Sequence, residues 1–203
     1  VIRDTNSLAS GRFIPVSGDN YKSKEEDKES IYRDKLVERC RVFEKVILFA
    51  PQASAFNPDY LFDAISESPD SWLWLVRLHP NTVPLMPTWK KIIKERNFEN
   101  VEIELATFAN ISEVFRAATN IVTPFSTVAT DALSYGHKPI LTYPGAHDFF
   151  ASYIDAGLMT RASSKTELLH KIRFMNLGQT ENKNRTFPKN QIDELLVQLV
   201  GRD

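Results

Sequence analysis

The sequence has 203 residues but lacks the features that mark several large protein classes. Cys40 is the only cysteine, so the chain holds neither an intrachain disulfide framework nor a cysteine-based zinc cluster, and a reducing, cytosolic setting is expected. No run of about 18 apolar residues is present to span a membrane, and no signal peptide is recognisable. The net charge of -1 attracts neither nucleic acid nor an acidic membrane. Any bound anion must therefore be held by a local site.

The chain is expected to hold one main domain preceded by an extension. Residues 1–44 are polar and charged, and they predict an N-terminal extension ending in a solvated linker helix with a narrow apolar stripe of Ile31, Leu36, Cys40 and Phe43. Residues 45–203 predict the domain, which ends in a C-terminal helix at 188–201. The hydrophobic content of 42% is sufficient for a core. Because the sequence begins with Val1 rather than methionine, we interpret it as part of a longer protein.

Apolar runs alternate with amphipathic segments from Lys45 onward. Short apolar runs closed by proline or glycine predict buried strands, and segments with helical spacing predict helices between them. This alternation predicts the α/β class, with a Rossmann-like parallel sheet flanked by helices, and ligands bind outside the carboxyl ends of such strands. Strands are expected at 45–51, 71–81, 100–105, 120–124 and 138–144, and helices at 57–68 (capped by Asn57), 86–98, 110–119 (capped by Asn110 or Ser112), 126–136, 148–158 and 163–177 (capped by Ser163 or Ser164).

The segment "RLHP" follows the second expected strand. Arg77 and His79 alternate across Leu78, so both side chains could project to the same side of the strand. A guanidinium fork and an imidazole suit a phosphate ester or a diphosphate. In the alternative interpretation, slightly favoured for this segment alone, Arg77 pairs with a carboxylate and His79 fills a gap in the core.

The segment "TPFST" follows the fourth expected strand and opens a helix. Ser126 and Thr127 place two hydroxyls and free backbone N–H groups at the positive end of that helix, which is typical of phosphate sites. An ordinary N-cap explains the same pattern equally well. Asp131 lies about one turn further on, where its carboxylate could accept a hydrogen bond from a ribose hydroxyl or from a neighbouring basic residue.

Three other loops offer weaker candidates. Gln52 and Ser54 follow the first strand, and His147 follows the fifth, where each could touch a ligand. Phe149, Phe150 and Tyr153 are interpreted as core residues rather than as a platform for stacking a base. No nucleophile elbow and no metal-ligand spacing is present, so no metal is expected. The third strand is followed by backbone groups that could read a nucleobase edge, at Thr107, Phe108 and Ala109.

The segments "RLHPN" and "TPFSTVATDALSYGHKPILTYP" resemble the C-terminal, nucleotide-binding half of a GT-B glycosyltransferase. The resemblance covers residues 45–177. It is closest to the bacterial group with an HP motif and a Ser/Thr motif, which includes sialyltransferases, Kdo transferases and CDP-glycerol glycerophosphotransferases of capsule, lipopolysaccharide and teichoic acid assembly. The fold implied is one half of a GT-B fold. The other half, which supplies the acceptor site, is not in this chain.

The resemblance implies a role for each motif. His79 and Pro80 would contact the donor phosphate and Arg77 would add charge, which makes His79 and Arg77 the catalytic candidates. Ser126 and Thr127 would hold phosphate oxygens, and the segment around Phe108 would line the base. Asn81, Thr123 and Asp131 complete the predicted pocket.

The same resemblance implies the substrates. The donor would be a nucleotide sugar, CMP- or CDP-linked or else UDP-linked, bound as substrate with no further cofactor. A glycan or lipid-linked acceptor would be bound by the missing N-terminal domain, and nucleic acid is not an expected partner. The expected location is the cytoplasm, with peripheral association of the full protein at the inner face of the membrane left open. Two alternatives remain: a UDP-GlcNAc 2-epimerase-like enzyme, although its "SGG" loop is absent, and a non-catalytic module.

Overall fold

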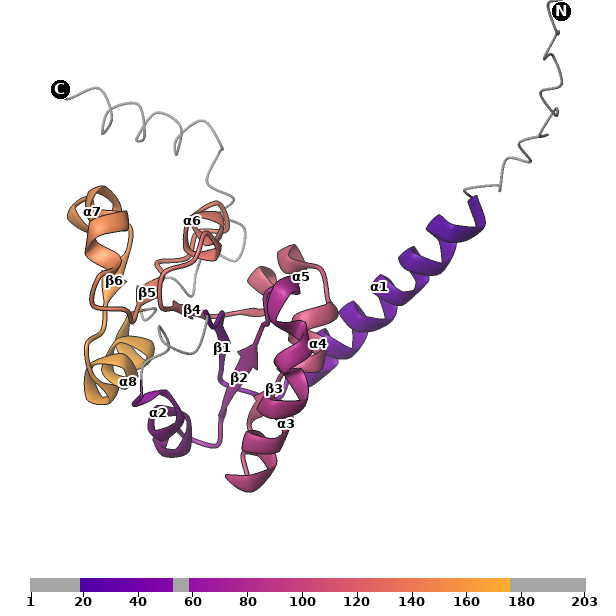
Figure 1. The fold of residues 1–203 in the computed structure, drawn as a ribbon, viewed down its shortest axis with the longest axis horizontal. Coiled ribbons are helices and arrows are strands. Elements are labelled where there is room, and N and C mark those ends of the chain that lie inside the picture. The colour runs from indigo at the N-terminus through magenta and orange to yellow at the C-terminus, as the bar shows by residue number, and fades with distance from the viewer. Residues whose placement is uncertain (1–18, 53–58, 176–203) are drawn as a thin grey trace, which may run out of the picture.

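The computed structural model describes residues 19–52 and 59–175 (Figure 1). The described strands form one parallel sheet in the order β3-β2-β1-β4-β5-β6. This order confirms the predicted α/β class with a Rossmann-like parallel sheet. The strands are β1 Lys45–Phe49, β2 Trp72–Val76, β3 Val101–Glu102, β4 Asn120–Thr123, β5 Ile140–Leu141 and β6 Thr160–Arg161.

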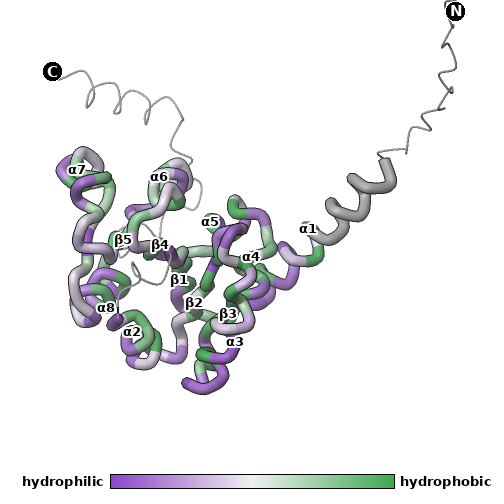
Figure 2. The backbone as a smooth tube through the Cα atoms, in the orientation of Figure 1, coloured by the Kyte–Doolittle hydropathy of each residue, from purple (hydrophilic) through white to green (hydrophobic). Residues whose placement is uncertain are grey.

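Helices cover both faces of the sheet. One face packs against α2 (Leu61–Glu67), α3 (Met86–Glu95) and α8 (Lys165–Phe174). The other face packs against α1 (Asp19–Cys40), α4 (Glu104–Phe108), α5 (Ile111–Ala117) and α6 (Val128–Leu133). The helix α7 (Ala146–Asp155) packs with α6 and β5 in a third, smaller cluster. Purple and green alternate along α3 and α8 in Figure 2, as is typical of helices that bury one side.

The sequence of the central strands explains their place in the sheet. Phe49 and Trp74 face the α2 side, whereas Leu48 and Leu75 face the α1 side, and all four side chains are fully buried. Successive strand residues point to opposite faces, so a continuous apolar run is the pattern that a strand covered on both faces requires. The runs "KVILF" and "WLWLV" therefore form the centre of the sheet.

The third strand is shorter than predicted. It ends at Glu102, whose carboxylate accepts hydrogen bonds from the backbone N–H groups of Glu104 and Leu105, both at 2.9 Å. That side chain satisfies two of the unpaired donors at the start of α4 and thereby begins a helix where the sequence predicted a strand. The strand prediction for residues 103–105 is wrong. A sixth strand, β6, and a 3-10 helix at Pro80–Leu85 were not predicted.

Two of the predicted helix caps are confirmed. The side chain of Asn110 accepts from the Ser112 N–H at 2.9 Å, and that of Ser164 accepts from the Glu167 N–H at 3.2 Å. The helix α2 begins at Leu61 with Tyr60 before it, later than predicted. Asn57 and the predicted helix at 188–201 lie outside the described residues.

The helix α1 projects away from the body of the domain (Figure 1). Leu36 and Cys40 bury their side chains against α4 and α5, as the predicted stripe requires. Ile31 is 52% exposed, so the stripe does not extend that far. Within the described part of the chain, no helix combines the length and the apolar character that a membrane crossing needs.

Candidate functional site

The sheet has one point at which the chain changes direction. From β1 the chain crosses to β2 and β3, and from β4 it crosses the opposite way to β5 and β6. Loops that leave the neighbouring strands β1 and β4 therefore diverge, and the crevice between them is where doubly wound sheets bind ligands. The described residues of these loops are 50–52 after β1 and 124–127 after β4.

The two loops are tied together at their base. The buried Thr123 hydroxyl donates to the Ala50 carbonyl at 2.8 Å, so this predicted pocket residue holds the strand ends in place. Above it, the Gln52 side-chain amide lies 3.5 Å from the Phe125 carbonyl. Gln52 is thus at the crevice, as its position after the first strand indicated, while Ser54 lies outside the described residues.

Ser126 lies two residues before the helix that follows β4, in which Thr127 holds the N-cap position. The Ser126 hydroxyl oxygen accepts from the Val128 N–H at 3.3 Å, and its carbonyl accepts from the Ala129 N–H at 2.9 Å. The Thr127 side chain makes no capping hydrogen bond, so the structure does not show an ordinary N-cap at either hydroxyl. Ser126 bonds the start of the helix from one position before the cap, and its hydroxyl proton is not consumed by that bond and remains a donor. Thr127 is exposed beside it. The helix itself, Val128–Leu133, is shorter than the predicted 126–136.

Arg77 is bound by the fold rather than directed at the crevice. Its Nη1 atom donates to the carbonyls of Ala106 at 2.5 Å and Ala109 at 2.8 Å, at the end of α4. Burial lowers the pKa of Arg77, yet a guanidinium stays protonated in proteins. Its partners are carbonyl oxygens, not the carboxylate of the alternative interpretation. The positive charge compensates the negative end of α4.

His79 lies at the surface after β2, so it fills no gap in the core. Its Nδ1 atom accepts from the Asn81 N–H at 3.2 Å and caps the 3-10 helix that starts at Pro80. That bond assigns the proton of neutral His79 to Nε2. β1 separates β2 from β4, so the two motifs stand about 10 Å apart across the sheet. The resemblance placed Arg77 and Ser126 at one donor phosphate, but Arg77 turns to the α4 side and bonds the carbonyls there.

The segment predicted to read a base is helical instead of a loop. The N–H groups of Thr107 and Ala109 are bonded to the carbonyls of Ile103 and Leu105 at 3.0 and 2.9 Å. The Thr107 hydroxyl accepts from the Leu78 N–H at 3.2 Å. The N–H groups of Thr107 and Ala109 are therefore occupied and are not free donors for a base edge. Phe108 is exposed and its ring lies 5.7 Å from that of Tyr32.

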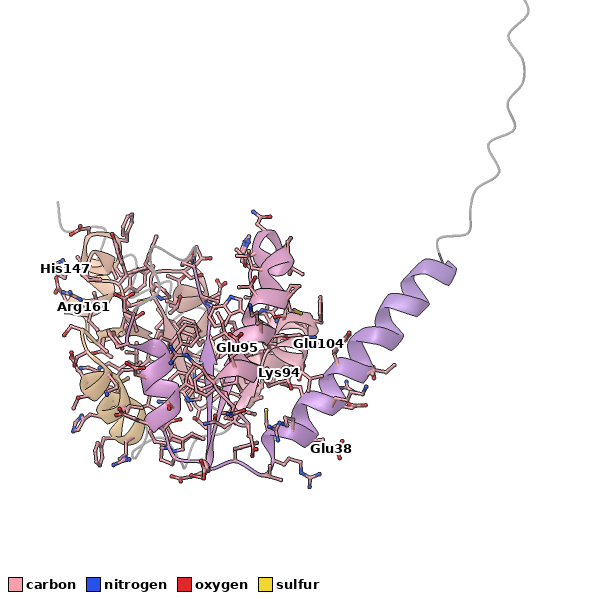
Figure 3. The ribbon with its side chains drawn as sticks, turned by 60° about the horizontal axis from the view of Figure 1, so that its bottom comes forward. Glu38, Lys94, Glu95, Glu104, His147 and Arg161 are labelled. Atoms are coloured by element: carbon pink, nitrogen blue, oxygen red, sulfur yellow. The ribbon has the colours of Figure 1, made fainter. Side chains whose placement is uncertain are left out.

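Asp131 and His147 are both exposed at the surface. Asp131 lies in the first turn of α6, and His147 in the first turn of α7. Figure 3 shows His147 with Arg161 at the α7 end of the molecule, away from Lys94 and Glu104.

Aromatic side chains gather where β4 and β5 end. The Phe125 ring centroid lies 5.1 Å from that of Tyr143 and 5.4 Å from that of Phe149, and the Phe149 ring is nearly parallel to it at 18°. We call Phe125, Tyr143 and Phe149 the aromatic rim. Phe149 is 65% exposed, so its assignment to the core is wrong, whereas Phe150 and Tyr153 are half-buried as core residues. The sequence signal was present, but helical spacing alone did not show which ring faces solvent.

A groove of about 420 Å³ lies elsewhere, between α3 and the β3 edge. Its walls carry both lysines and glutamates, and Lys90 forms an ion pair with Glu104 beside it. Carboxylates on its wall disfavour a phosphate ligand, because like charges repel. The crevice at the switch point remains the candidate site.

Comparison with known proteins gives a match in structure alone. No protein-family model and no curated protein matches the sequence. A solved structure of the wall teichoic acid polymerase TagF, soaked with CDPG for 30 minutes, matches with a TM-score of 0.51 and 17% sequence identity, over 89% of this chain and 44% of that one. The chain has the fold of part of TagF. A structure of TagF after a 15 minute soak matches with a TM-score of 0.49 and 18% identity, over 92% and 44% of the two chains.

The likeness to TagF is one of fold, and this chain spans less than half of TagF. It agrees with the Rossmann-like sheet and with the predicted half of a GT-B fold. The roles of the individual site residues, the donor and the acceptor stay predictions.

Proposed function

We propose that this chain is the donor-binding domain of a GT-B glycosyltransferase and that it holds the phosphate of a nucleotide sugar at the switch point between β1 and β4. The observation that carries the proposal is the doubly wound sheet, whose diverging loops bring the Ser126 hydroxyl and the Gln52 amide to one crevice. Ligand sites in open α/β sheets form at this position.

The crevice offers donors to phosphate oxygens. The Ser126 and Thr127 hydroxyls can each donate to an anionic oxygen, and hydrogen bonds to charged groups are stronger than neutral ones. His79, one strand further, presents its Nε2–H, because its Nδ1 atom accepts from the Asn81 N–H. During transfer the nucleotide leaves with increased negative charge, which fixed donors of this kind stabilise. Arg77 contributes through its positive charge at a distance, because its Nη1 atom is engaged with α4.

The proposed donor is CMP- or CDP-linked, or else UDP-linked, as the motif resemblance implies. The acceptor would be a glycan or lipid-linked molecule of bacterial surface polysaccharide or lipopolysaccharide synthesis, held by the other half of the enzyme. In this proposal the chain alone binds the donor without completing the transfer.

One observation favours a second candidate, a non-catalytic module of the same fold. The guanidinium of Arg77, the strongest cation of the predicted site, is committed to α4 carbonyls. A module without nucleotide affinity would need no free cation near the crevice.

Calorimetric titration of the full chain with CMP, CDP, UDP and GDP distinguishes the two candidates. We expect one pyrimidine nucleotide to bind. Ser126→Gly removes the hydroxyl together with one hydrogen bond of 3.3 Å before the N-cap position of α6, which costs about 1 kcal/mol of stability or less, so the variant tests binding with little loss of stability. We expect this variant to weaken nucleotide binding about tenfold or more, the value of a hydrogen bond to a charged group.

The matched control is Ser134→Gly, which removes an exposed serine at the opposite end of α6 and should leave the affinity unchanged. If no nucleotide binds, the non-catalytic module is correct. Equal affinities for wild type and Ser126→Gly would move the phosphate away from the start of α6. A product assay in which UDP-GlcNAc is interconverted with another UDP-sugar, with release of free sugar, would identify an epimerase instead.

A further inference from the structure

The aromatic rim lies directly beside the proposed phosphate position. Phe125 immediately precedes Ser126, and neighbouring Cα atoms are about 3.8 Å apart, so the rim and the hydroxyl belong to the same short loop. Phe149 reaches this loop from α7 and stacks on the Phe125 ring. A base and its phosphate are joined by a single ribose in a nucleotide. The rim is therefore within the span of a nucleotide whose phosphate lies at Ser126.

Phe149 has the form of a stacking platform. One side of its ring rests on Phe125 at a centroid distance of 5.4 Å, while 65% of the residue is open to solvent. An aromatic ring that stacks on a second ring with one face and is exposed to solvent on its other face can accept another planar ring by offset stacking. Exposed apolar surface of this kind at the edge of a ligand crevice marks a binding site more often than an isolated surface residue does.

Contacts hold the loops that carry Phe125 and Tyr143. The Phe125 carbonyl is contacted by Gln52, and the Pro144 carbonyl accepts from Arg161 Nη2 at 3.0 Å. Gly145 packs against the ring of Tyr143 so closely that a Cβ atom there would lie 2.7 Å from it. When a ligand binds, a ring supported by loops that are already held in place loses less conformational entropy than a ring on a mobile loop.

The opposite side of the crevice offers no equivalent. The N–H groups of Thr107 and Ala109 are consumed within α4, and the exposed Phe108 ring packs towards Tyr32 of α1. Arg77 also occupies the gap between β2 and α4 with its own hydrogen bonds. A base on that side would find no free N–H at Thr107 or Ala109, and the Phe108 ring there is tilted by 42° against Tyr32 rather than stacked in parallel.

We propose that Phe149, supported by Phe125, stacks on the nucleobase of the bound donor. This inference rests on the proposed function, and it places the base on the β5 side of the crevice rather than on the α4 side. Stacking recognises the planar ring that every base shares, so Phe149 contributes affinity for the nucleoside part and none for the phosphate.

The experiment compares ligands with and without a base on the full chain. CMP, CDP and UDP carry the ring, and inorganic pyrophosphate serves as the base-free probe. Stacking on an aromatic side chain is worth about 1–3 kcal/mol per base, so Phe149→Ala should weaken nucleotide binding by about 5- to 150-fold. Pyrophosphate affinity should stay the same. Phe149→Trp should retain nucleotide affinity, because the platform persists.

Two matched variants control for the loss of an exposed phenylalanine. Phe174→Ala removes a ring that is 49% exposed on α8, and Phe108→Ala removes one that is 44% exposed on α4. Neither should change nucleotide affinity. A proton NMR spectrum gives a second readout: the base protons of the bound nucleotide should shift upfield through the ring current of Phe149, and this shift should vanish in Phe149→Ala.

The outcomes separate this inference from the proposed function. Unchanged nucleotide affinity in Phe149→Ala, with weakened affinity in Ser126→Gly, overturns the stacking role and leaves the donor site intact. A loss in Phe108→Ala instead assigns the base to α4. An equal loss of nucleotide and pyrophosphate binding in Phe149→Ala means that the ring only supports the loop. If the wild-type chain binds no nucleotide, both proposals are wrong.

Discussion

Arg77 donates its hydrogen bonds to backbone carbonyls of the fold. It crosses from β2 to the end of α4, where its Nη1 atom bonds the carbonyls of Ala106 and Ala109. Both of those residues are buried, so their carbonyls depend on the guanidinium for a hydrogen-bond donor within the fold. At the scale of one residue, Arg77 is therefore first a stabilising group.

Replacing Arg77 with methionine should destabilise the fold. Arg77→Met keeps much of the apolar stem and leaves two carbonyls without a donor, which predicts a loss of about 2–4 kcal/mol in the free energy of unfolding. Urea denaturation measures it. Arg116→Met is the control, because Arg116 is 61% exposed in its ion pair with Glu113, and such pairs contribute about 0.5 kcal/mol or less. Equal losses in the two variants would contradict the anchoring role.

Cys40 gives the fold a defined response to alkaline pH. Burial raises the pKa of the Cys40 thiol to about 11. The unfolded chain, with a lower thiol pKa, releases its proton first as the pH rises, so deprotonation favours the unfolded state. The stabilising contribution is complete below the pKa of an ordinary thiol and is lost as the pH rises towards about 11.

The corresponding measurement is the urea stability of wild type and Cys40→Ala from pH 7 to pH 10. Wild type should lose on the order of 1 kcal/mol more than the variant between these limits. Tyr60, whose pKa burial raises to about 12, affects both proteins equally. Parallel pH profiles for the two proteins would show that the Cys40 thiol ionises in the folded state as it does in water.

The sequence predicted which residues lie at the candidate site better than it predicted the hydrogen-bond partners of those residues. Ser126 at a helix start and Gln52 after the first strand follow from local patterns, and the structure brings both to the switch point. The partners of Arg77 could not be predicted, because they are carbonyls of α4, a helix that depends on the Glu102 side chain. A long-range contact of this kind is not encoded in the spacing of the residues that make it.

At the scale of elements, side-chain caps decide where helices begin. Ser164 accepts from the Glu167 N–H at the start of α8, and the Glu167 carboxylate accepts from the N–H and hydroxyl of Ser163, both at 2.9 Å. This arrangement is similar to a capping box, shifted by one residue at its second bond. Its pattern, a serine with a glutamate three residues on, is local, which is why the sequence predicted this cap.

Replacement of Ser164 tests the contribution of that cap. Ser164→Ala should lower the free energy of unfolding by about 1 kcal/mol, and Ser164→Gly by only a few tenths. The comparison uses thermal and urea denaturation. Ser152→Ala, at an exposed position within α7, should leave the stability the same or raise it slightly, because alanine is the better helix former. A larger loss for glycine than for alanine would exclude capping as the cause.

The short elements are those that the sequence described least well. The pattern "NVEIEL" alternates like a strand, yet only Val101 and Glu102 pair with β2, and the residues after them turn into α4. β6 consists of Thr160 and Arg161 only, and two residues are too few to show the alternation of apolar and polar side chains that predicts a strand. Pairing at a sheet edge depends on a neighbouring strand being in place, so two-residue strands follow from tertiary structure.

At the scale of the whole molecule, the order of the strands determines where a ligand can bind. Strands β1 and β4 are neighbours because the crossovers run in opposite directions from the centre of the sheet. Periodicity predicted the strands and their parallel direction, since strand–helix alternation with right-handed crossovers permits few topologies. It did not predict that β1 separates the "RLHP" and "TPFST" segments. That separation leaves the crevice less positively charged than the sequence indicated.

The most direct test of the donor site is an NMR titration of the 15N-labelled full chain with CMP, CDP and UDP. We expect saturable changes in amide shifts that are largest at Ala50, Gln52 and residues 126–128, on the two sides of the switch point. The groove between α3 and the β3 edge should show none. Shifts centred on that groove, or no saturable shift with any of the three nucleotides, would show that the switch point between β1 and β4 is not a donor site.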